Sequence, residues 1–246
     1  MSSVVTVTVF RYQPQARFQA FANMGRFLMQ PFKLDGLQFS KLMGSGRDFG
    51  LVPDFSTYVH LGVWQDESSA RQFPESNSYQ YLSKGTEQIS TLYLKHIKSH
   101  GLWGGQNPFR SGQIDEVNLK TSTLSSNPAT PIAVLTRATI RPRALPDFWR
   151  HVPQARQRLK EHSDNLLFGI GVGEAPLVQQ CTISVWRDPA AVDQYAYRQT
   201  GHKEVVRLTR QRQWYSEELF ARFQVYEAQG NIFTKIANQL ADKASS

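Results

Sequence analysis

An internal repeat restricts the fold of this chain more than any other feature of its sequence. A β-branched run from Val4 to Phe10 opens the first half, and a similar run from Ile132 to Ile140 opens the second. Each run precedes a segment with apolar residues three or four positions apart, the spacing of an amphipathic helix. Self-similarity over this distance indicates one supersecondary unit used twice, so we expect two similar halves.

The order of elements within each half is also the same. Residues 61–66 read Leu-Gly-Val-Trp-Gln-Asp, and residues 183–188 read Ile-Ser-Val-Trp-Arg-Asp. A glycine-rich hairpin precedes each of these strands, over 39–46 and 168–174, and a short helix follows, from Glu67 to Phe73 and from Pro189 to Tyr197. With a second helix and a closing strand, the order becomes β-α-β-β-α-β, which is the ferredoxin-like split βαβ unit.

The sequence therefore predicts an α+β protein in which a tandem duplication of a ferredoxin-like βαββαβ unit forms a dimeric α+β barrel within one chain. We assign residues 1–110 to an N-terminal half and 131–230 to a C-terminal half. Residues 111–130, rich in Ser, Thr and Asn, form the expected linker. Residues 231–246 form a tail, which we expect to fray from Ala237 onward because it is short and polar.

Composition limits the partners and the compartment. The net charge is +8, but the basic residues are dispersed and form no recognisable nucleic-acid motif, so we expect no nucleic-acid partner. An anionic membrane surface or an acidic electron carrier suits such a charge better. The single cysteine, Cys181, excludes an intrachain disulfide, and the chain shows no signal peptide and no membrane-spanning run. These features predict a cytoplasmic protein with peripheral contact to a membrane.

Familiar catalytic motifs are absent from the sequence. Gly169-x-Gly171-x-Gly173 superficially resembles a dinucleotide-binding loop, but a strand rather than a helix should follow it, so hairpin glycines are expected. No Gly-x-Ser-x-Gly elbow occurs, and the six histidines include no His-Glu-x-x-His zinc motif. Hydrolysis by a familiar constellation is therefore not expected.

One histidine distinguishes the two halves. When Trp64 is placed on Trp186, His202 aligns with Gln80, so only the second half has an imidazole at the start of its second helix. This histidine could be a single metal or haem ligand, or a helix cap exposed to solvent. The aromatic segment from Trp214 to Tyr226 would suit a flat macrocycle or an ordinary core equally well. The residues alone leave both alternatives open.

Long collinear strings of residues distinguish the chain: Phe39-x-Lys41-Leu42-Met43-Gly44-Ser45-Gly46, Trp103-x-Gly105-x-x-Pro108-Phe109, Leu135-Thr136-Arg137-Ala138-Thr139-Ile140, Gly171-x-Gly173-Glu174-x-Pro176 with Gln179-Gln180, Trp186 with Asp188, and His202 followed by Trp214-Tyr215-Ser216-Glu217-Glu218-Leu219-Phe220-Ala221-Arg222-Phe223. In these strings, and from Val4 to about Gly230, the chain resembles the spheroidene monooxygenases of carotenoid biosynthesis. The chain departs from the family in the loop 195–201 and after Gly230. These departures concern substrate identity more than fold.

The resemblance implies an enzyme that adds keto oxygen to an acyclic, apolar carotenoid with dioxygen and a reductant, such as ferredoxin. Haem b is the implied cofactor, and related haem barrels place one proximal histidine on a helix of the C-terminal half, which is matched here by His202. A distal polar residue follows on the next strand. Arg222 is the first candidate, because Ala221 and Phe223 would point to the opposite strand face. Arg137 is the second candidate, as a contact to a haem propionate.

Further expectations concern the surroundings of the haem. Trp214 and Phe223 are the aromatic residues expected to flank it. Five other aromatic residues could line a channel for the carotenoid or form the barrel core: Phe10, Phe39, Trp64, Trp149 and Phe168. Two other functions stay open, a haem lyase resembling aldoxime dehydratase and a non-enzymatic barrel that binds haem or lipid.

Overall fold

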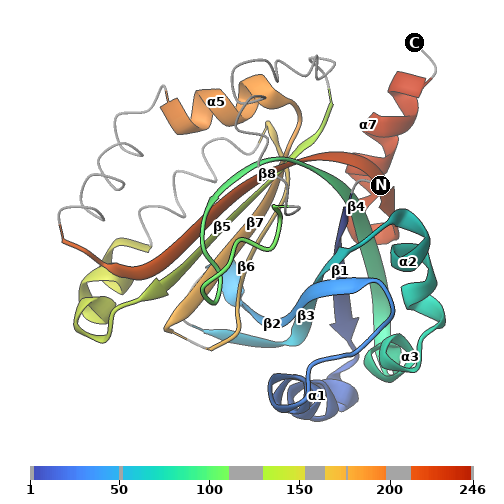
Figure 1. Cartoon of the computed structure of the whole chain (residues 1–246), viewed down its shortest axis with the longest axis horizontal. Helices are drawn as coiled ribbons and strands as arrows, with labels where there is room; N and C mark the ends of the chain where they lie inside the picture. The colour runs from blue at the N-terminus through green and yellow to red at the C-terminus, as the bar shows by residue number, and fades with distance from the viewer. Residues whose placement is uncertain are drawn as a thin grey trace.

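A closed barrel of antiparallel strands forms the body of the protein (Figure 1). The computed structural model describes residues 3–49, 52–110, 130–152, 164–175, 177–197 and 212–244. The strands are β1 (Val4–Tyr12), β2 (Leu37–Gly46), β3 (Pro53–Trp64), β4 (Thr86–Gly101), β5 (Ile132–Ile140), β6 (Leu166–Gly173), β7 (Gln179–Trp186) and β8 (Tyr215–Gln229). The α-helices of the described segments are α1 (Arg17–Met29), α2 (Glu67–Gln72), α3 (Asn77–Ser83), α5 (Pro189–Tyr197) and α7 (Thr234–Ala244), and residues 145–152 are also helical.

The strand order confirms the predicted duplication. Around the barrel the strands follow the order β1-β3-β2-β6-β7-β5-β8-β4. Each half is thus a four-stranded sheet, β4-β1-β3-β2 or β8-β5-β7-β6, and the two sheets have the same order. The register agrees too, since Val4 pairs with Trp64 in the first half and Ile132 pairs with Trp186 in the second. The α+β class and the barrel formed within one chain are both confirmed.

The two seams between the halves differ in length. At one seam β4 pairs with β8 from Thr91 to Gly101. At the other, β2 and β6 share only two registered pairs, Gly44 with Gly173 and Ser45 with Val172. The barrel is therefore closed mainly by the β4–β8 seam.

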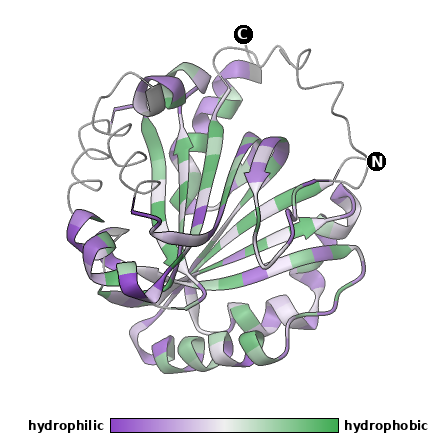
Figure 2. Cartoon of the chain, turned by 60° about the vertical axis from the view of Figure 1, so that its left-hand side comes forward, coloured by the Kyte–Doolittle hydropathy of each residue, from purple (hydrophilic) through white to green (hydrophobic). Residues whose placement is uncertain are grey.

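The barrel interior is packed with side chains rather than hollow. Apolar residues from the inner strand faces form the largest core cluster, as the hydrophobic colouring along the strands indicates (Figure 2). The segment 102–110 adds Trp103 and Phe109 to this cluster. Cys181 is buried in β7, and its burial raises the pKa of the thiol. Of the aromatic residues considered for a channel, Phe39 and Phe168 pack against this interior cluster. Phe10 and Trp64 are buried instead on the outer sheet faces of the first half, in clusters with residues of α1 and α2.

The C-terminal tail differs from the sequence-based expectation. Instead of fraying from Ala237, it forms a 3-10 turn at Asn231–Phe233 and then helix α7, which continues to Ala244. Phe233 and Ile236 are fully buried in the barrel core, and Leu240 packs against it. This apolar spacing anchors a helix whose remaining residues are polar. The expected linker, except Thr130, lies outside the described residues.

Among the helices of the described segments, none combines the length and the apolar character needed to cross a bilayer.

Candidate functional site

The two halves differ on the outer faces of their sheets, the faces that point away from the barrel interior. Because the strand registers match, each outer-face residue of the first half has a counterpart in the second. Thr8 pairs with His60 as Thr136 pairs with Thr182. The remaining equivalences follow from the same registers and relate Phe10 to Ala138, Tyr58 to Gln180, and Leu42 to Gly171.

In the first half this outer face is filled. Phe10, Leu42 and His60 are at most 1% exposed. The ring of Phe27, from α1, packs edge-on against His60 with 6.2 Å between the ring centroids. Burial lowers the pKa of His60 to about 3, so this imidazole is neutral at physiological pH. The first half therefore has no space for a ligand between α1 and the sheet.

In the second half the equivalent positions carry small side chains. Phe10 is replaced by Ala138, Leu42 by Gly171, and the imidazole of His60 by a threonine hydroxyl. Thr136 is exposed in the middle of a central strand, whereas its counterpart Thr8 is only 1% exposed. We call these outer-face positions, which lack the bulk of their first-half counterparts, the second-half hollow. It is formed by Thr136, Ala138, Gly171, Gln180 and Thr182.

Arg222 lies beside the second-half hollow. It is on the outer face of β8, opposite Val134 of β5, and two positions from Phe220, the partner of Thr136. Its side chain is 12% exposed, and one guanidinium nitrogen donates to Asp193 Oδ1 of α5 at 3.0 Å. Its Nε is buried and has no hydrogen-bond partner among the described residues. Arg222 therefore combines a fixed orientation with a donor group that is still free.

A second cation adds to the charge near Arg222. Lys98 of β4 pairs in register with Arg222 across the long seam. Burial lowers the pKa of Lys98, and the neighbouring guanidinium lowers it further, while Asp193 opposes the change. Positive charge therefore collects at this border of the second half.

The predicted site residues do not form one cluster. Phe223 points into the barrel interior, where it packs edge-on against Phe109 with ring centroids 4.9 Å apart. Arg137 also points inward, and its side chain is only 3% exposed. Both lie on the opposite sheet face from Arg222. Trp214 is buried at the end of the second half and donates to Asp147 Oδ2 at 2.8 Å. His202 lies outside the described residues.

Arg137 belongs to a cluster of ionic groups inside the barrel, which we call the interior ion cluster (Lys41, Arg137, Glu174 and Glu217). Arg137 forms an ion pair with Glu217 and lies 3.9 Å from the Glu174 carboxylate. Glu174 also accepts hydrogen bonds from Lys41 Nζ at 2.5 Å and from Trp103 Nε1 at 2.6 Å. The four charges balance, and every carboxylate has at least two donors or cations.

The interior ion cluster also holds the segment 102–110. Glu217 accepts from the backbone N–H groups of Gly104 and Gly105 at 3.0 and 2.8 Å. Partial burial opposes ionisation of Glu217, but these two N–H groups and Arg137 together lower its pKa. Sequence analysis assigned no role to Lys41, Glu174 or Glu217. A signal was present, because each of these charges lies within one of the strings that carry the family resemblance.

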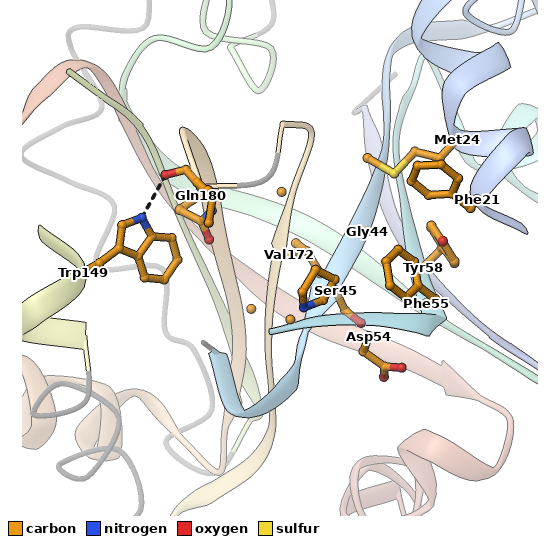
Figure 3. A pocket seen from close by; sticks show the side chains of 15 residues that line it. Phe21, Met24, Gly44, Ser45, Asp54, Phe55, Tyr58, Trp149, Val172 and Gln180 are labelled. Atoms are coloured by element: carbon orange, nitrogen blue, oxygen red, sulfur yellow. Dashed lines mark hydrogen bonds between the residues drawn. The ribbon is translucent and has the colours of Figure 1, made fainter. Parts of the chain in front are cut away.

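A groove crosses the short seam between β2 and β6 (Figure 3). We call it the seam groove. Its enclosed volume is about 80 Å³, and the rest of the groove is open to solvent. The lining residues are Phe21, Met24, Gly44, Ser45, Gly46, Pro53, Asp54, Phe55, Tyr58, Trp149, Gly171, Val172, Gly173, Leu177 and Gln180. It meets the second-half hollow at Gly171 and Gln180.

Within the described residues, no group of three or more His, Cys, Asp or Glu side chains could hold a metal ion.

The fold is that of the dimeric α+β barrel proteins, here in a single chain. A solved aldoxime dehydratase in complex with butyraldoxime matches with a TM-score of 0.57 and 12% identity, over 96% of this chain and 85% of that one. A second aldoxime dehydratase structure matches with a TM-score of 0.55 and 14% identity, over 91% and 81%. At such low identity the likeness concerns the fold alone.

Sequence comparison identifies the family. No protein-family model matches the chain. A spheroidene monooxygenase from Rhodobacter capsulatus is 32% identical over 203 residues, which cover 81% of this chain and 80% of the relative. One from Cereibacter sphaeroides is 32% identical over 226 residues, covering 90% and 66%, and one from Rubrivivax gelatinosus is 28% identical over 223 residues, covering 89% and 81%. The chain belongs to the spheroidene monooxygenase family, and it is an oxygenase by that membership.

Proposed function

We propose that this protein is a haem-dependent monooxygenase that introduces keto oxygen into an acyclic carotenoid, with dioxygen and a reductant such as ferredoxin. Three spheroidene monooxygenases related over most of the chain support the reaction and the substrate class. The second-half hollow is the structural observation that carries the assignment of a cofactor. It occupies the position that Phe10 and Leu42 fill in the first half.

The residues of the second half suit a haem. A porphyrin is flat and largely apolar, so it needs a sheet face free of large side chains, which Ala138, Gly171 and Thr182 provide. His202 is the residue that would hold the haem iron, because the first half has Gln80 at the aligned position. When bound, the haem would supply the oxidising chemistry, while the protein supplies orientation and electrostatics.

Arg222 is the proposed distal donor. Its guanidinium stays charged at any working pH, and the ion pair with Asp193 fixes its direction. Hydrogen-bond donors on the distal side of a haem decide between binding oxygen and activating it. Nε of Arg222, buried and without a described partner, is the group suited to that donation.

The overall reaction needs two oxygenations at one carbon. In each, one atom of dioxygen enters a C–H bond as hydroxyl, and the other leaves as water after uptake of two electrons and two protons. The second oxygenation gives a geminal diol, which loses water to form the ketone. The electrons come from the reductant, so the surface must admit a protein donor. The net charge of +8 suits an acidic one, such as ferredoxin.

Hemin titration of the purified full chain tests the cofactor assignment. We expect a Soret band that His202→Ala loses and that the exposed-residue control Lys235→Ala keeps. Oxygen uptake with reductant and an acyclic carotenoid then tests the reaction. Soret absorption without oxygen uptake would favour a lyase or a carrier. Absence of hemin binding would refute the haem assignment.

A further inference from the structure

The floor of the seam groove is bare backbone. Gly44 of β2 pairs directly with Gly173 of β6, and on the outer face the next positions along these strands are Gly46 and Gly171. Side chains alternate along a strand, so no side chain rises from the floor at these four positions. A Cβ added at Gly44 would lie 3.3 Å from Met24 Sδ, which shows how closely the wall approaches.

Aromatic rings form the walls on both sides of the floor (Figure 3). On the first-half side, Phe21 of α1 and Phe55 of β3 meet edge to face with ring centroids 5.7 Å apart. On the second-half side, the indole Nε1 of Trp149 donates to the Leu177 carbonyl at 3.1 Å, which fixes the ring. Asp54 is the only ionic residue in the lining, and its carboxylate accepts from Ser56 at 2.5 Å. A flat floor between aromatic walls suits a thin, unbranched, conjugated chain.

We propose that the seam groove binds the extended polyene of the substrate and guides one end of it into the second-half hollow. Gly171 and Gln180 belong to both the groove and the hollow, so the two sites are continuous. The identity of the polyene follows from the proposed function, whereas its location follows from the groove. The oxidised carbon would then lie near one end of the chain.

Polyene binding to the haem-free protein tests this location independently of catalysis. Titration with an acyclic carotenoid in detergent is followed by quenching of tryptophan fluorescence. Gly46→Phe fills the groove floor, and we expect it to weaken polyene binding at least tenfold while hemin binding is unchanged. Lys235→Phe adds the same ring at an exposed position of α7 outside the groove lining and should bind like wild type.

The outcomes separate the two proposals. Equal polyene affinity of Gly46→Phe and wild type would overturn the groove assignment, even for a protein that oxidises carotenoids. Groove-dependent binding without oxygen uptake would keep the groove and refute the proposed reaction. Circular dichroism of Gly46→Phe shows whether the variant is folded. If the folded variant also binds hemin more weakly, the groove is not a site separate from the haem site, and the groove assignment is overturned.

A second inference concerns the outward face of α1. Phe18 and Met29 are 83% and 85% exposed, and Phe21 and Leu28 are about half exposed. They lie on one stripe of the helix, opposite the stripe of Met24 and other residues buried against the sheet. Large contiguous apolar surface on a folded protein marks an interaction site.

Charge indicates the partner of this face. Arg17 and Arg26 lie on either side of the apolar stripe, and Lys33 follows the helix. No acidic residue occurs before Asp35. Apolar residues flanked by cations suit the interface of an anionic bilayer. The geometry points to α1 as a docking surface for an anionic membrane, from which an apolar substrate would enter the groove beside Phe21.

Sedimentation of the full chain with lipid vesicles tests the docking surface. We expect binding to phosphatidylcholine vesicles that contain phosphatidylglycerol, and at least fivefold weaker binding of the variant Phe18→Ser with Met29→Ser. Leu102→Ser, a change of an exposed apolar residue outside α1, should bind like wild type. Equal sedimentation of all three proteins, or self-association through α1 in the absence of lipid, would overturn the proposal.

Discussion

Phe10 and Ala138 occupy equivalent positions on the central strands of the two halves, opposite Tyr58 and Gln180, respectively. The phenyl ring of Phe10 is fully buried, whereas the methyl group of Ala138 leaves the same layer of the second half without a large side chain. This single difference leads to the most direct test of the second-half hollow.

Filling the hollow should prevent haem binding. In Ala138→Phe the second half acquires the residue of the first, and we expect at least a tenfold loss of hemin affinity because the ring occupies the space of the macrocycle. Hemin titration measures the effect, and Ala138→Ser is the small control. Unchanged hemin affinity in a folded Ala138→Phe protein would show that the haem binds elsewhere.

Removal of the proposed distal donor should affect turnover more than cofactor binding. For Arg222→Gln we expect the rate of product formation to fall about 100-fold or more, since losing one preorganised donor costs about 10² to 10³ in rate. Hemin affinity should change little. Asp193→Asn, which only loosens the guanidinium, should have a smaller effect. A fully active Arg222→Gln enzyme would contradict the assigned role.

The interior ion cluster should contribute strongly to stability. Glu174→Gln leaves Arg137 and Lys41 with reduced compensation inside the barrel, and removal of one partner of a buried pair costs about 3–5 kcal/mol. Urea unfolding measures this loss. In the double variant Lys41→Met with Glu174→Gln, part of the stability should return, because one uncompensated cation is removed. A loss below about 1 kcal/mol would indicate that the cluster is screened by water.

His60 should make the protein sensitive to acid. Its pKa is near 6.5 in the unfolded chain but about 3 when folded, so below pH 6.5 the unfolded state binds the extra proton. The free energy of unfolding should therefore fall by up to about 1.4 kcal/mol per pH unit between pH 6 and pH 4 on account of this residue. His60→Leu should show a correspondingly shallower slope in urea unfolding. Identical slopes would mean that the imidazole reaches water.

Helix α7 should be part of the folded core and not an appendage. Phe233→Ala removes a fully buried ring, for which we expect a loss of about 3–5 kcal/mol. The neighbouring exposed change Lys235→Ala should alter stability by no more than about 0.5 kcal/mol. Thermal or urea unfolding of both variants measures the difference. Equal stabilities would mean that the tail is frayed, as the sequence predicted.

Much of the fold was predictable because local patterns and the global repeat agree. The β-branched runs that begin at Val4 and Ile132 form central strands, as predicted. The alternation of side chains along β8 places Arg222 on one face of the sheet and its neighbours Ala221 and Phe223 on the other, also as predicted. Helix α7 was missed, since its polar composition obscured the spacing of Ile236 and Leu240.

The site was less predictable, because it depends on contacts between distant segments. Lys41 and Glu174 are 133 positions apart, and no local pattern indicates that they meet. The hollow was hidden for another reason. Trp64 and Trp186 are 122 positions apart in the sequence. Their respective strand partners, Val4 and Ile132, are 128 positions apart, so one constant offset cannot align both strands of the two halves. Only the register shows that Ala138 stands in the place of Phe10.

The covalent union of the two halves has a consequence for how such a protein can change. Two identical subunits would carry every substitution twice, so any opening made for a ligand would weaken both copies of the structure. Within one chain, His60 and Phe10 keep the first half rigid while the second is free to lose bulk at Ala138 and Gly171. One half can thus carry small side chains on its outer face, because its twin retains the packing of an intact scaffold.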